Sequence, residues 1–228
     1  MTVRYEELSV EWLGYATARL ETDGGSVVYT DPGRYGVLDD YWARDGDLVV
    51  VTHDHHYDSD GIRSVASDDA TLAIYEAVDP AGIDRDVEPI DALAADYDVV
   101  RVRPLRVVVG RDRPHADLAG GSVAHPPGFG CGFLLSLGGR TVFWPGDSDA
   151  LDGFAELDVS VFLANIGGGG IVSDRREAAD LAEAMGPDLV VPIHYDTFDL
   201  LEADGEAFAG DVASRSIPVA LDARSANQ

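Results

Sequence analysis

The chain has 228 residues, of which 46% are hydrophobic, so it can bury a sizeable core and we expect one domain over residues 1–228. No apolar run approaches the ~20 residues of a membrane helix, and the first ten residues, MTVRYEELSV, lack the apolar stretch of a signal peptide. We therefore expect a cytoplasmic protein with no membrane partner. The single cysteine, Cys131, excludes an intrachain disulfide and a structural zinc site built on several thiolates.

Charge is the most unusual bulk property of this chain. Acidic residues outnumber basic ones by 42 to 16, the net charge is −26, and every basic residue is an arginine. Such a surface repels nucleic acid, which is thus disfavoured as a partner. The acids are scattered and form no runs. We therefore interpret the acidic surface as halophile-like, because concentrated salt screens the interaction of charges that lie more than about 3 Å apart. The expected partner is therefore a small-molecule substrate.

Short β-type segments separated by turn residues dominate the chain. The expected strands are Val10–Leu13, Ala16–Glu21, Ser26–Thr30, Leu48–Val51, Thr71–Tyr75, Val99–Val109, Ser122–Ala124, Gly132–Leu137, Thr141–Trp144, Val159–Ala164 and Leu189–Pro192. Many short strands with few helices predict β-sheets packed face to face with helices outside, an α+β fold.

Helices are fewer, and the clearest is predicted at Arg175–Met185. Asp174 and Glu177 have the spacing of a capping box, and Gly186 is placed to end the helix. Further helices are predicted at Gly61–Ala66, Pro80–Asp84 and Glu206–Ser214.

A histidine-rich segment directly follows the apolar run Leu48–Val51. It contains His53 and His55, which have the i, i+2 spacing that places two side chains on the same side of an extended backbone. Imidazole nitrogen suits zinc and similar transition metals. The spacing therefore predicts that both rings approach one cation.

Three other polar residues also follow expected strands, namely His125, Asp147 and His194. Each one alone is adequately explained as a capping or turn residue. Strand ends at one edge of packed sheets, however, are where sites are commonly assembled. Together with His53 and His55, these residues predict a metal centre.

At this point the chain resembles the metallo-β-lactamase fold superfamily, and within it the L-ascorbate-6-phosphate-lactonase-like branch of metal-dependent hydrolases. The resemblance runs from about Glu11 to Phe198. It is carried by the segments Trp12–Thr17, Thr30–Pro32, Thr52–Asp60, His125 with Gly132–Phe133, Pro145–Ser148 and Pro192–Phe198. It implies a four-layer αββα sandwich whose site lies at one edge between the two sheets.

The resemblance also implies a role for each matching residue. His53, His55 and His125 are expected to hold a first metal, Asp147 to bridge two metals, and His194 to belong to the second. The expected cofactor is Zn²⁺, one or two ions, with Mn²⁺ as an alternative.

The match departs from the family in the histidine-rich segment. The family pattern is His-x-His-x-Asp-His, but its last two positions are here Tyr57 and Asp58. Tyr15 stands where this branch usually has histidine. Asp58 is expected to serve as a replacement ligand, because a carboxylate oxygen is acceptable to zinc or manganese. His56 could also turn inward, although nothing in the spacing requires it, so a remodelled two-metal site and a single-metal site both remain open.

The predicted activity is hydrolysis of a small polar ester, lactone or phosphoester by metal-activated water. Asp58 and Asp147 are the expected catalytic residues, and Tyr57 and Tyr195 are expected to contact the substrate, as donors to an oxyanion. One alternative is a non-catalytic relative that binds metal or ligand, which the Tyr57-Asp58 replacement favours. Another is a phosphodiesterase or nuclease, which the acidic surface disfavours.

Overall fold

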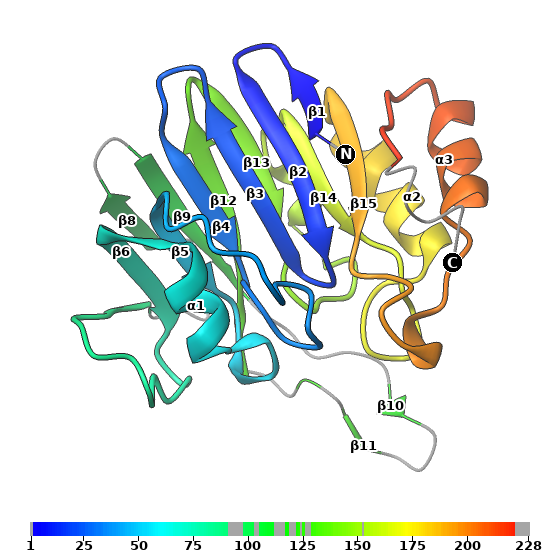
Figure 1. Ribbon diagram of the computed structural model, residues 1–228. Coiled ribbons are helices and arrows are strands. Elements are labelled where there is room, and N and C mark those ends of the chain that lie inside the picture. The colour runs from blue at the N-terminus through cyan, green and yellow to red at the C-terminus, as the bar shows by residue number, and fades with distance from the viewer. Residues whose placement is uncertain are drawn as a thin grey trace.

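The computed structural model describes residues 2–90, 98–102, 105–111, 117–118, 122–123, 125, 129–151 and 153–221. Two β-sheets face each other, with helices outside them (Figure 1), as the sequence predicts. The first sheet has the order β1-β2-β3-β4-β5-β6-β7, and the second has the order β15-β14-β13-β12-β9-β8. Helix α1 contacts β5 of the first sheet, and α2 contacts β14 of the second.

The elements have the following bounds. The first sheet consists of β1 (Thr2–Tyr5), β2 (Leu8–Gly14), β3 (Thr17–Thr22), β4 (Val27–Thr30), β5 (Gly46–Val51), β6 (Ala66–Tyr75) and β7 (Glu88–Ile90). The second consists of β8 (Asp98–Val102), β9 (Leu105–Arg111), β12 (Cys131–Leu137), β13 (Arg140–Trp144), β14 (Val161–Asn165) and β15 (Leu189–Ile193). A separate pair is formed by β10 (Asp117–Leu118) and β11 (Ser122–Val123). The helices are α1 (Ser59–Val65), α2 (Arg175–Met185) and α3 (Gly205–Ser214), with 3₁₀ turns η1 (Asp54–His56), η2 (Phe154–Glu156) and η3 (Asp199–Leu201).

Two of the predicted elements are wrong. The segment Val99–Val109 is not one strand but two antiparallel strands, β8 and β9, in which Val102 pairs with Leu105. A proline between them in the sequence, Pro104, lacks the N–H that a continuous strand needs. The predicted helix Pro80–Asp84 is a turn with a single i→i+3 bond from the amide of Ile83 to the carbonyl of Pro80. The predicted strand Ser122–Ala124 corresponds to β11, and residue 124 lies outside the described residues.

Each sheet contains a run of parallel strands that extends to one of its edges. In the first sheet β4 pairs in parallel with β5, and in the second β14 pairs in parallel with both β13 and β15. Every residue of β4, β14 and β15 is buried, which explains their continuous apolar sequences. Because the carboxyl ends of parallel strands meet at the same edge, polar residues that follow them are brought together.

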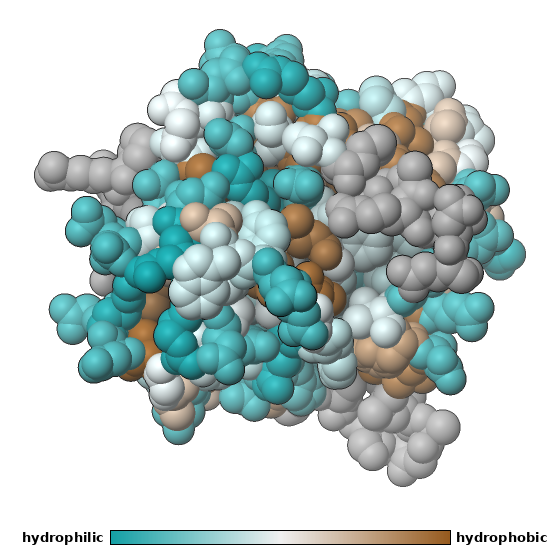
Figure 2. All heavy atoms as spheres, viewed as in Figure 1, coloured by the Kyte–Doolittle hydropathy of each residue, from teal (hydrophilic) through white to brown (hydrophobic). Residues whose placement is uncertain are grey.

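The face of the molecule in Figure 2 is largely hydrophilic, with small apolar areas between polar side chains. Some of the arginines are paired there, for example Arg19 with Glu21 and Asp45, both at 2.7 Å. Within the described part of the chain, none of the helices is long and apolar enough to cross a membrane.

The N-terminus of α2 is capped as the sequence predicts. The Asp174 carboxylate accepts the amides of Arg176 and Glu177 at 2.7 and 3.0 Å, and the Glu177 side chain accepts the amide of Asp174 at 2.8 Å. We expect Asp174→Ala to destabilise the fold by about 1 kcal/mol and to lower Tm by about 2–4 °C, measured by thermal unfolding. Asp174→Asn is the matched control, because asparagine caps equally well; an equal loss in both variants would contradict the role of the cap.

Candidate metal centre

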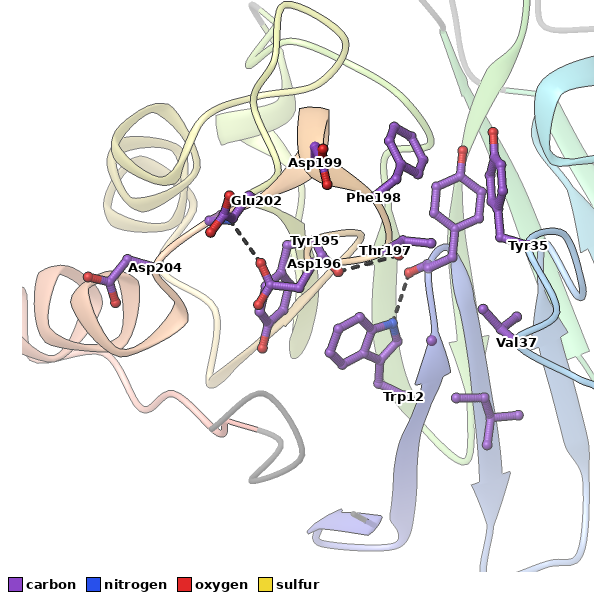
Figure 3. A pocket seen from close by; sticks show the side chains of 14 residues that line it. Trp12, Tyr35, Val37, Tyr195, Asp196, Thr197, Phe198, Asp199, Glu202 and Asp204 are labelled. Atoms are coloured by element: carbon purple, nitrogen blue, oxygen red, sulfur yellow. Dashed lines mark hydrogen bonds between the residues drawn. The ribbon is translucent and has the colours of Figure 1, made fainter. Parts of the chain in front are cut away.

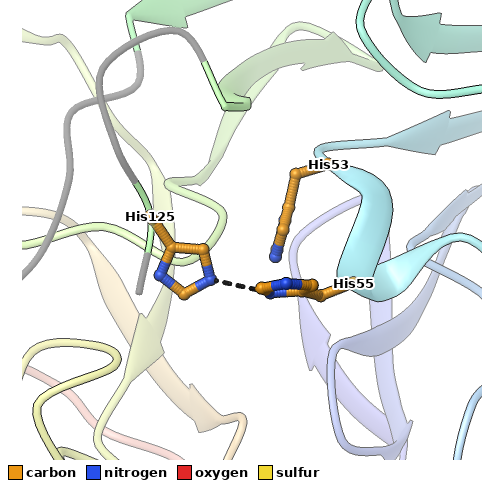
Figure 4. Close-up of side chains that lie close together, drawn as sticks. All are labelled: His53, His55 and His125. Atoms are coloured by element: carbon orange, nitrogen blue, oxygen red, sulfur yellow. Dashed lines mark hydrogen bonds between the residues drawn. The ribbon is translucent and has the colours of Figure 1, made fainter. Parts of the chain in front are cut away.

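Five of the six predicted ligands converge at one edge of the two sheets, and the sixth, Asp58, caps α1 instead. His53 and His55 follow β5, Asp147 follows β13, and His194 follows β15. His53, His125, Asp147 and His194 are buried, whereas His55 is exposed. Figure 4 shows the rings of His53, His55 and His125 around a common space. The ligand atoms of these three histidines all lie within 4.8 Å of one another.

One oxygen of Asp147 belongs to this first group of histidines. Its Oδ2 lies 3.4 Å from Nε2 of His125 and 3.7 Å from Nε2 of His53. Nδ1 of His55 lies 3.3 Å from Nε2 of His125. Nε2 of His53 is buried and has no hydrogen-bond partner among the described residues.

The other oxygen of Asp147 belongs to a second group, which contains a histidine outside the predicted set. Asp147 Oδ1 lies 3.0 Å from Nε2 of His194 and 3.2 Å from Nε2 of His56. The two nitrogens are themselves 3.2 Å apart. Thus one carboxylate faces two clusters of imidazole nitrogens, one with each oxygen.

These separations fit a divalent cation. Tetrahedral zinc with bonds of about 2.0–2.1 Å requires neighbouring ligand atoms to lie about 3.3 Å apart. The 3.0–3.4 Å edges are close to this length, and the 3.7 Å edge is slightly longer. Imidazole nitrogens with a shared carboxylate are also the donor set that zinc prefers. The second group therefore has the edges of one tetrahedral site, and the three histidines of the first group, whose ligand atoms lie within 4.8 Å of one another, offer the donors for another ion.

A second carboxylate, Asp31, lies behind the histidines. Its Oδ2 is 3.0 Å from Nδ1 of His56 and also accepts hydrogen bonds from Thr52 Oγ1 at 2.9 Å and Trp144 Nε1 at 2.7 Å. Because the Thr52 hydroxyl donates to Asp31, it is an acceptor for Nδ1 of His53, 2.9 Å away. Both histidines thus carry a proton on Nδ1, which turns Nε2 of each ring toward Asp147.

Buried charge dominates the electrostatics of the centre. Burial, reinforced by neighbouring His56, holds the pKa of His53 well below its usual value, so this ring is neutral. Burial alone would raise the pKa of Asp147, but His194 and His56 hold that pKa well below its usual range. Burial would lower the pKa of His56, but Asp147 and Asp31 together raise it to about 10. The second group therefore attracts positive charge, either a proton on His56 or a cation.

The backbone around the centre is held in an unfavourable conformation. His194, Tyr15 and Asp31 have φ values of 59°, 47° and 38°, in the left-handed region that non-glycine residues rarely adopt. Such residues concentrate at functional sites, where surrounding contacts enforce them; here the amide of His194 donates to the carbonyl of Tyr15 at 2.9 Å. Gly146, beside Asp147, is needed for close approach, because a Cβ there would lie 2.8 Å from the carbonyl oxygen of Cys131.

The structure places the predicted catalytic residue Asp58 elsewhere. Asp58 is the N-cap of α1: its Oδ1 accepts the amides of Asp60 and Gly61, and its Oδ2 accepts the amide of Arg34 at 2.8 Å. Although burial opposes it, these backbone donors lower the pKa of Asp58. Asp58 belongs to neither group of close ligand atoms, and its oxygens hold two loops together.

The two predicted substrate-binding tyrosines occupy different environments. The Tyr57 hydroxyl donates to the carbonyl of Ala81 at 2.7 Å, so the Tyr57 side chain is directed toward the loop after β6. Tyr195 is buried, and its ring stacks on Trp12 with centroids 4.7 Å apart. Of the two, Tyr195 lines the hollow described next, and Tyr57 does not.

A hollow of about 890 Å³ lies beside the metal centre (Figure 3). Aromatic side chains form much of its wall, and four acidic residues also line it: Asp196, Asp199, Glu202 and Asp204. The ring of Tyr15 belongs to this wall and also packs against the rings of His194 and His56, with centroids 4.5 and 5.0 Å away. The hollow and the metal centre are therefore neighbours that share Tyr15.

Two residues of the centre received no assigned role from the sequence, although His56 was considered as a ligand that could turn inward and Asp31 lies in the Thr30–Pro32 segment that carries the resemblance. The first is His56, which lies three residues after His53, and the second is Asp31, which follows β4. An available signal for Asp31 was its position after a strand, the same signal that identified Asp147. The signal for His56 was weaker, because it depends on the local turn described below.

The fold and the clustered ligands define a class: proteins with a metallo-β-lactamase fold and a His/Asp metal centre between two sheets. Comparison with known proteins supports this class. Residues 9–194 match the family model of the beta-lactamase superfamily domain. The chain is 30% identical to a UPF0173 protein of Pyrococcus furiosus over 92% of this chain and 93% of that one. It therefore belongs to the metallo-β-lactamase superfamily.

Two further similarities agree with this membership. A second Pyrococcus furiosus protein, named a UPF0173 metal-dependent hydrolase, is 27% identical over 94% of this chain and 96% of its own length. The metallo-β-lactamase fold protein YhfI of Bacillus subtilis superposes with a TM-score of 0.62 at 17% identity, covering 92% of this chain and 89% of that one. The narrower lactonase-like branch stays a prediction.

Proposed function

We propose that this protein is a metal-dependent hydrolase of a small polar ester, lactone or phosphoester. The observation that carries the proposal is the carboxylate of Asp147, whose two oxygens face two groups of histidine nitrogens at ligand-to-ligand distances. Relatives named as metal-dependent hydrolases, which match over nearly the whole chain, support it.

Each residue of the centre has a definable task in such a reaction. His53, His55 and His125 would hold a first cation, while Asp147 and His194 would hold a second. When bound, Zn²⁺ or Mn²⁺ supplies Lewis acidity and lowers the pKa of a coordinated water toward ~7. Thr52 and Asp31 keep the ring of His53 oriented through its Nδ1 proton.

His55 and Phe129 determine how solvent and substrate reach the metal centre. His55 is exposed, so a substrate would approach the centre from its side. The ring of Phe129 packs against the rings of His53, His55 and His125, with centroids 5.6, 4.8 and 5.7 Å away. An apolar ring in this position displaces water from the ligands and strengthens their electrostatic interaction with a bound cation.

The hollow favours one substrate class over another. Its aromatic walls suit an apolar or uncharged group, whereas its four acidic residues would repel a phosphate. Among the three candidate classes, an uncharged ester or lactone is thus favoured over a phosphoester. In this arrangement Tyr195, inside the hollow, is the predicted tyrosine that can contact the substrate.

A panel of chromogenic substrates tests the proposal. Protein stripped with EDTA and reloaded with Zn²⁺ or Mn²⁺ is expected to hydrolyse p-nitrophenyl esters and simple lactones, and to hydrolyse bis-p-nitrophenyl phosphate at least about tenfold more slowly, the effect of one repulsive interaction of about 1.4 kcal/mol. Stripped protein is the control and should be inactive. Faster turnover of the phosphodiester would refute the substrate class. Full metal loading without turnover of any substrate would support the non-catalytic alternative.

A further inference from the structure

The metal centre contains a histidine that the family pattern does not supply. We infer that His56 is a ligand of the second metal and replaces the Asp-His pair that is missing at Tyr57 and Asp58. The inference rests on the proposed metal-dependent function only in requiring that metal binds; it does not require catalysis.

The first argument is geometric. Nε2 of His56, Nε2 of His194 and Oδ1 of Asp147 form a triangle with edges of 3.2, 3.2 and 3.0 Å. A single tetrahedral zinc ion requires edges of about 3.3 Å. All three residues are buried, so these atoms are held in place by packing and not by chance surface contact.

The second argument comes from the positions of protons. Nδ1 of His56 lies 3.0 Å from Oδ2 of Asp31, which also accepts from Thr52 and Trp144, so Nδ1 is the protonated nitrogen. In a neutral ring, Nε2 therefore presents a lone pair to the carboxylate of Asp147, which is also an acceptor. Two acceptors 3.2 Å apart repel each other unless positive charge lies between them, and either a proton on Nε2 or a shared cation provides that charge.

The third argument is that His56 has the kind of hydrogen-bond partner that normally orients a metal-binding histidine, namely the carboxylate of Asp31. Histidines that bind metals usually donate their second nitrogen to a carboxylate or carbonyl, which sets the tautomer and the direction of the ring. Asp31 is fully buried and makes this contact directly. The ring of His56 is also enclosed by Tyr15 and by His53, with centroids 5.0 and 4.1 Å away.

Asp58, the competing candidate, is already committed to another role. Both of its oxygens accept backbone amides, from Asp60, Gly61 and Arg34. To bind the metal it would have to give up the N-cap of α1. The geometry therefore assigns the second metal to His56, His194 and Asp147.

Metal stoichiometry tests this assignment without any activity measurement. Purified wild-type protein, His56→Gln and Asp58→Asn are each stripped, reloaded with Zn²⁺, freed of excess metal and analysed by elemental mass spectrometry. We expect two ions per chain in the wild type and in Asp58→Asn, and one in His56→Gln. Circular dichroism of each variant confirms that it is folded.

The opposite pattern, one ion in Asp58→Asn and two in His56→Gln, would overturn the inference, as would equal stoichiometry in the wild type and His56→Gln. If His56→Gln does not fold, anomalous scattering from wild-type crystals soaked in Zn²⁺ decides. An anomalous peak within about 2.2 Å of Nε2 of His56 supports the assignment. If metal peaks are present but none lies at this distance from Nε2 of His56, the assignment is refuted. The stoichiometry can succeed while the hydrolysis assays fail, so the two proposals are separable.

Discussion

Replacement of Asp147 by asparagine is expected to reduce hydrolysis by on the order of 10³-fold or more, the equivalent of losing several kcal/mol of Lewis-acid stabilisation. The reason is that Asp147 faces both histidine groups at once, through Oδ2 at 3.4 Å from His125 and through Oδ1 at 3.0 Å from His194. Asparagine keeps the shape, but it supplies only one oxygen and no negative charge, so at least one ion should be lost. Rates on the best ester substrate and zinc stoichiometry, measured on the same samples, check both parts.

Asp158→Asn is a suitable control, because it makes the same chemical change at an exposed carboxylate that belongs to neither group of close ligand atoms. It should retain wild-type rate and metal content. If Asp147→Asn kept two ions per chain and a rate within tenfold of the wild type, the carboxylate could not be the shared ligand.

The largest loss of stability is expected for Asp31→Ala, at about 3–5 kcal/mol, the usual consequence of removing one partner from a buried charged network. Its carboxylate accepts the amide and hydroxyl of Thr52 at 2.7 and 2.9 Å and the indole of Trp144 at 2.7 Å. Alanine would leave these buried donors without their acceptor, each at a desolvation cost of about 1–3 kcal/mol. Denaturant unfolding of the metal-free protein measures the change without interference from metal binding.

Asp23→Ala is the comparison for this experiment. Asp23 forms an exposed ion pair with Arg4 at 2.5 Å, and surface pairs of this kind contribute at most about 1 kcal/mol. A similar, small loss in both variants would show that the donors around position 31 find other partners, and that Asp31 does not organise the centre.

Much of the centre was predictable because most of its candidate ligands follow buried strands. The apolar run Leu48–Val51 identified β5, and the polar residues after it were then expected at a sheet edge. The same reasoning located Asp147 after β13 and His194 after β15. This worked because a buried parallel strand must be continuously apolar, so the first polar residues after it mark the edge where the sheets meet solvent. The helix Arg175–Met185 was predicted to the residue, since its capping box and its terminal glycine are local signals.

The composition and order of the chain thus determined the fold class and five converging candidate ligands, because the hydrophobic pattern of a segment indicates whether it is a buried strand and where that strand ends. Which neighbouring residue completes the second group was decided only by tertiary structure. The sequence argument assumed an extended backbone with a period of two after His53, whereas Asp54–His56 is a 3₁₀ turn in which the amide of His56 bonds to the carbonyl of His53 at 3.2 Å. A 3₁₀ turn has three residues per turn, so it stacks His56 beside His53, with ring centroids 4.1 Å apart. The same turn carries Asp58 outward to the start of α1, where free backbone amides hold its carboxylate.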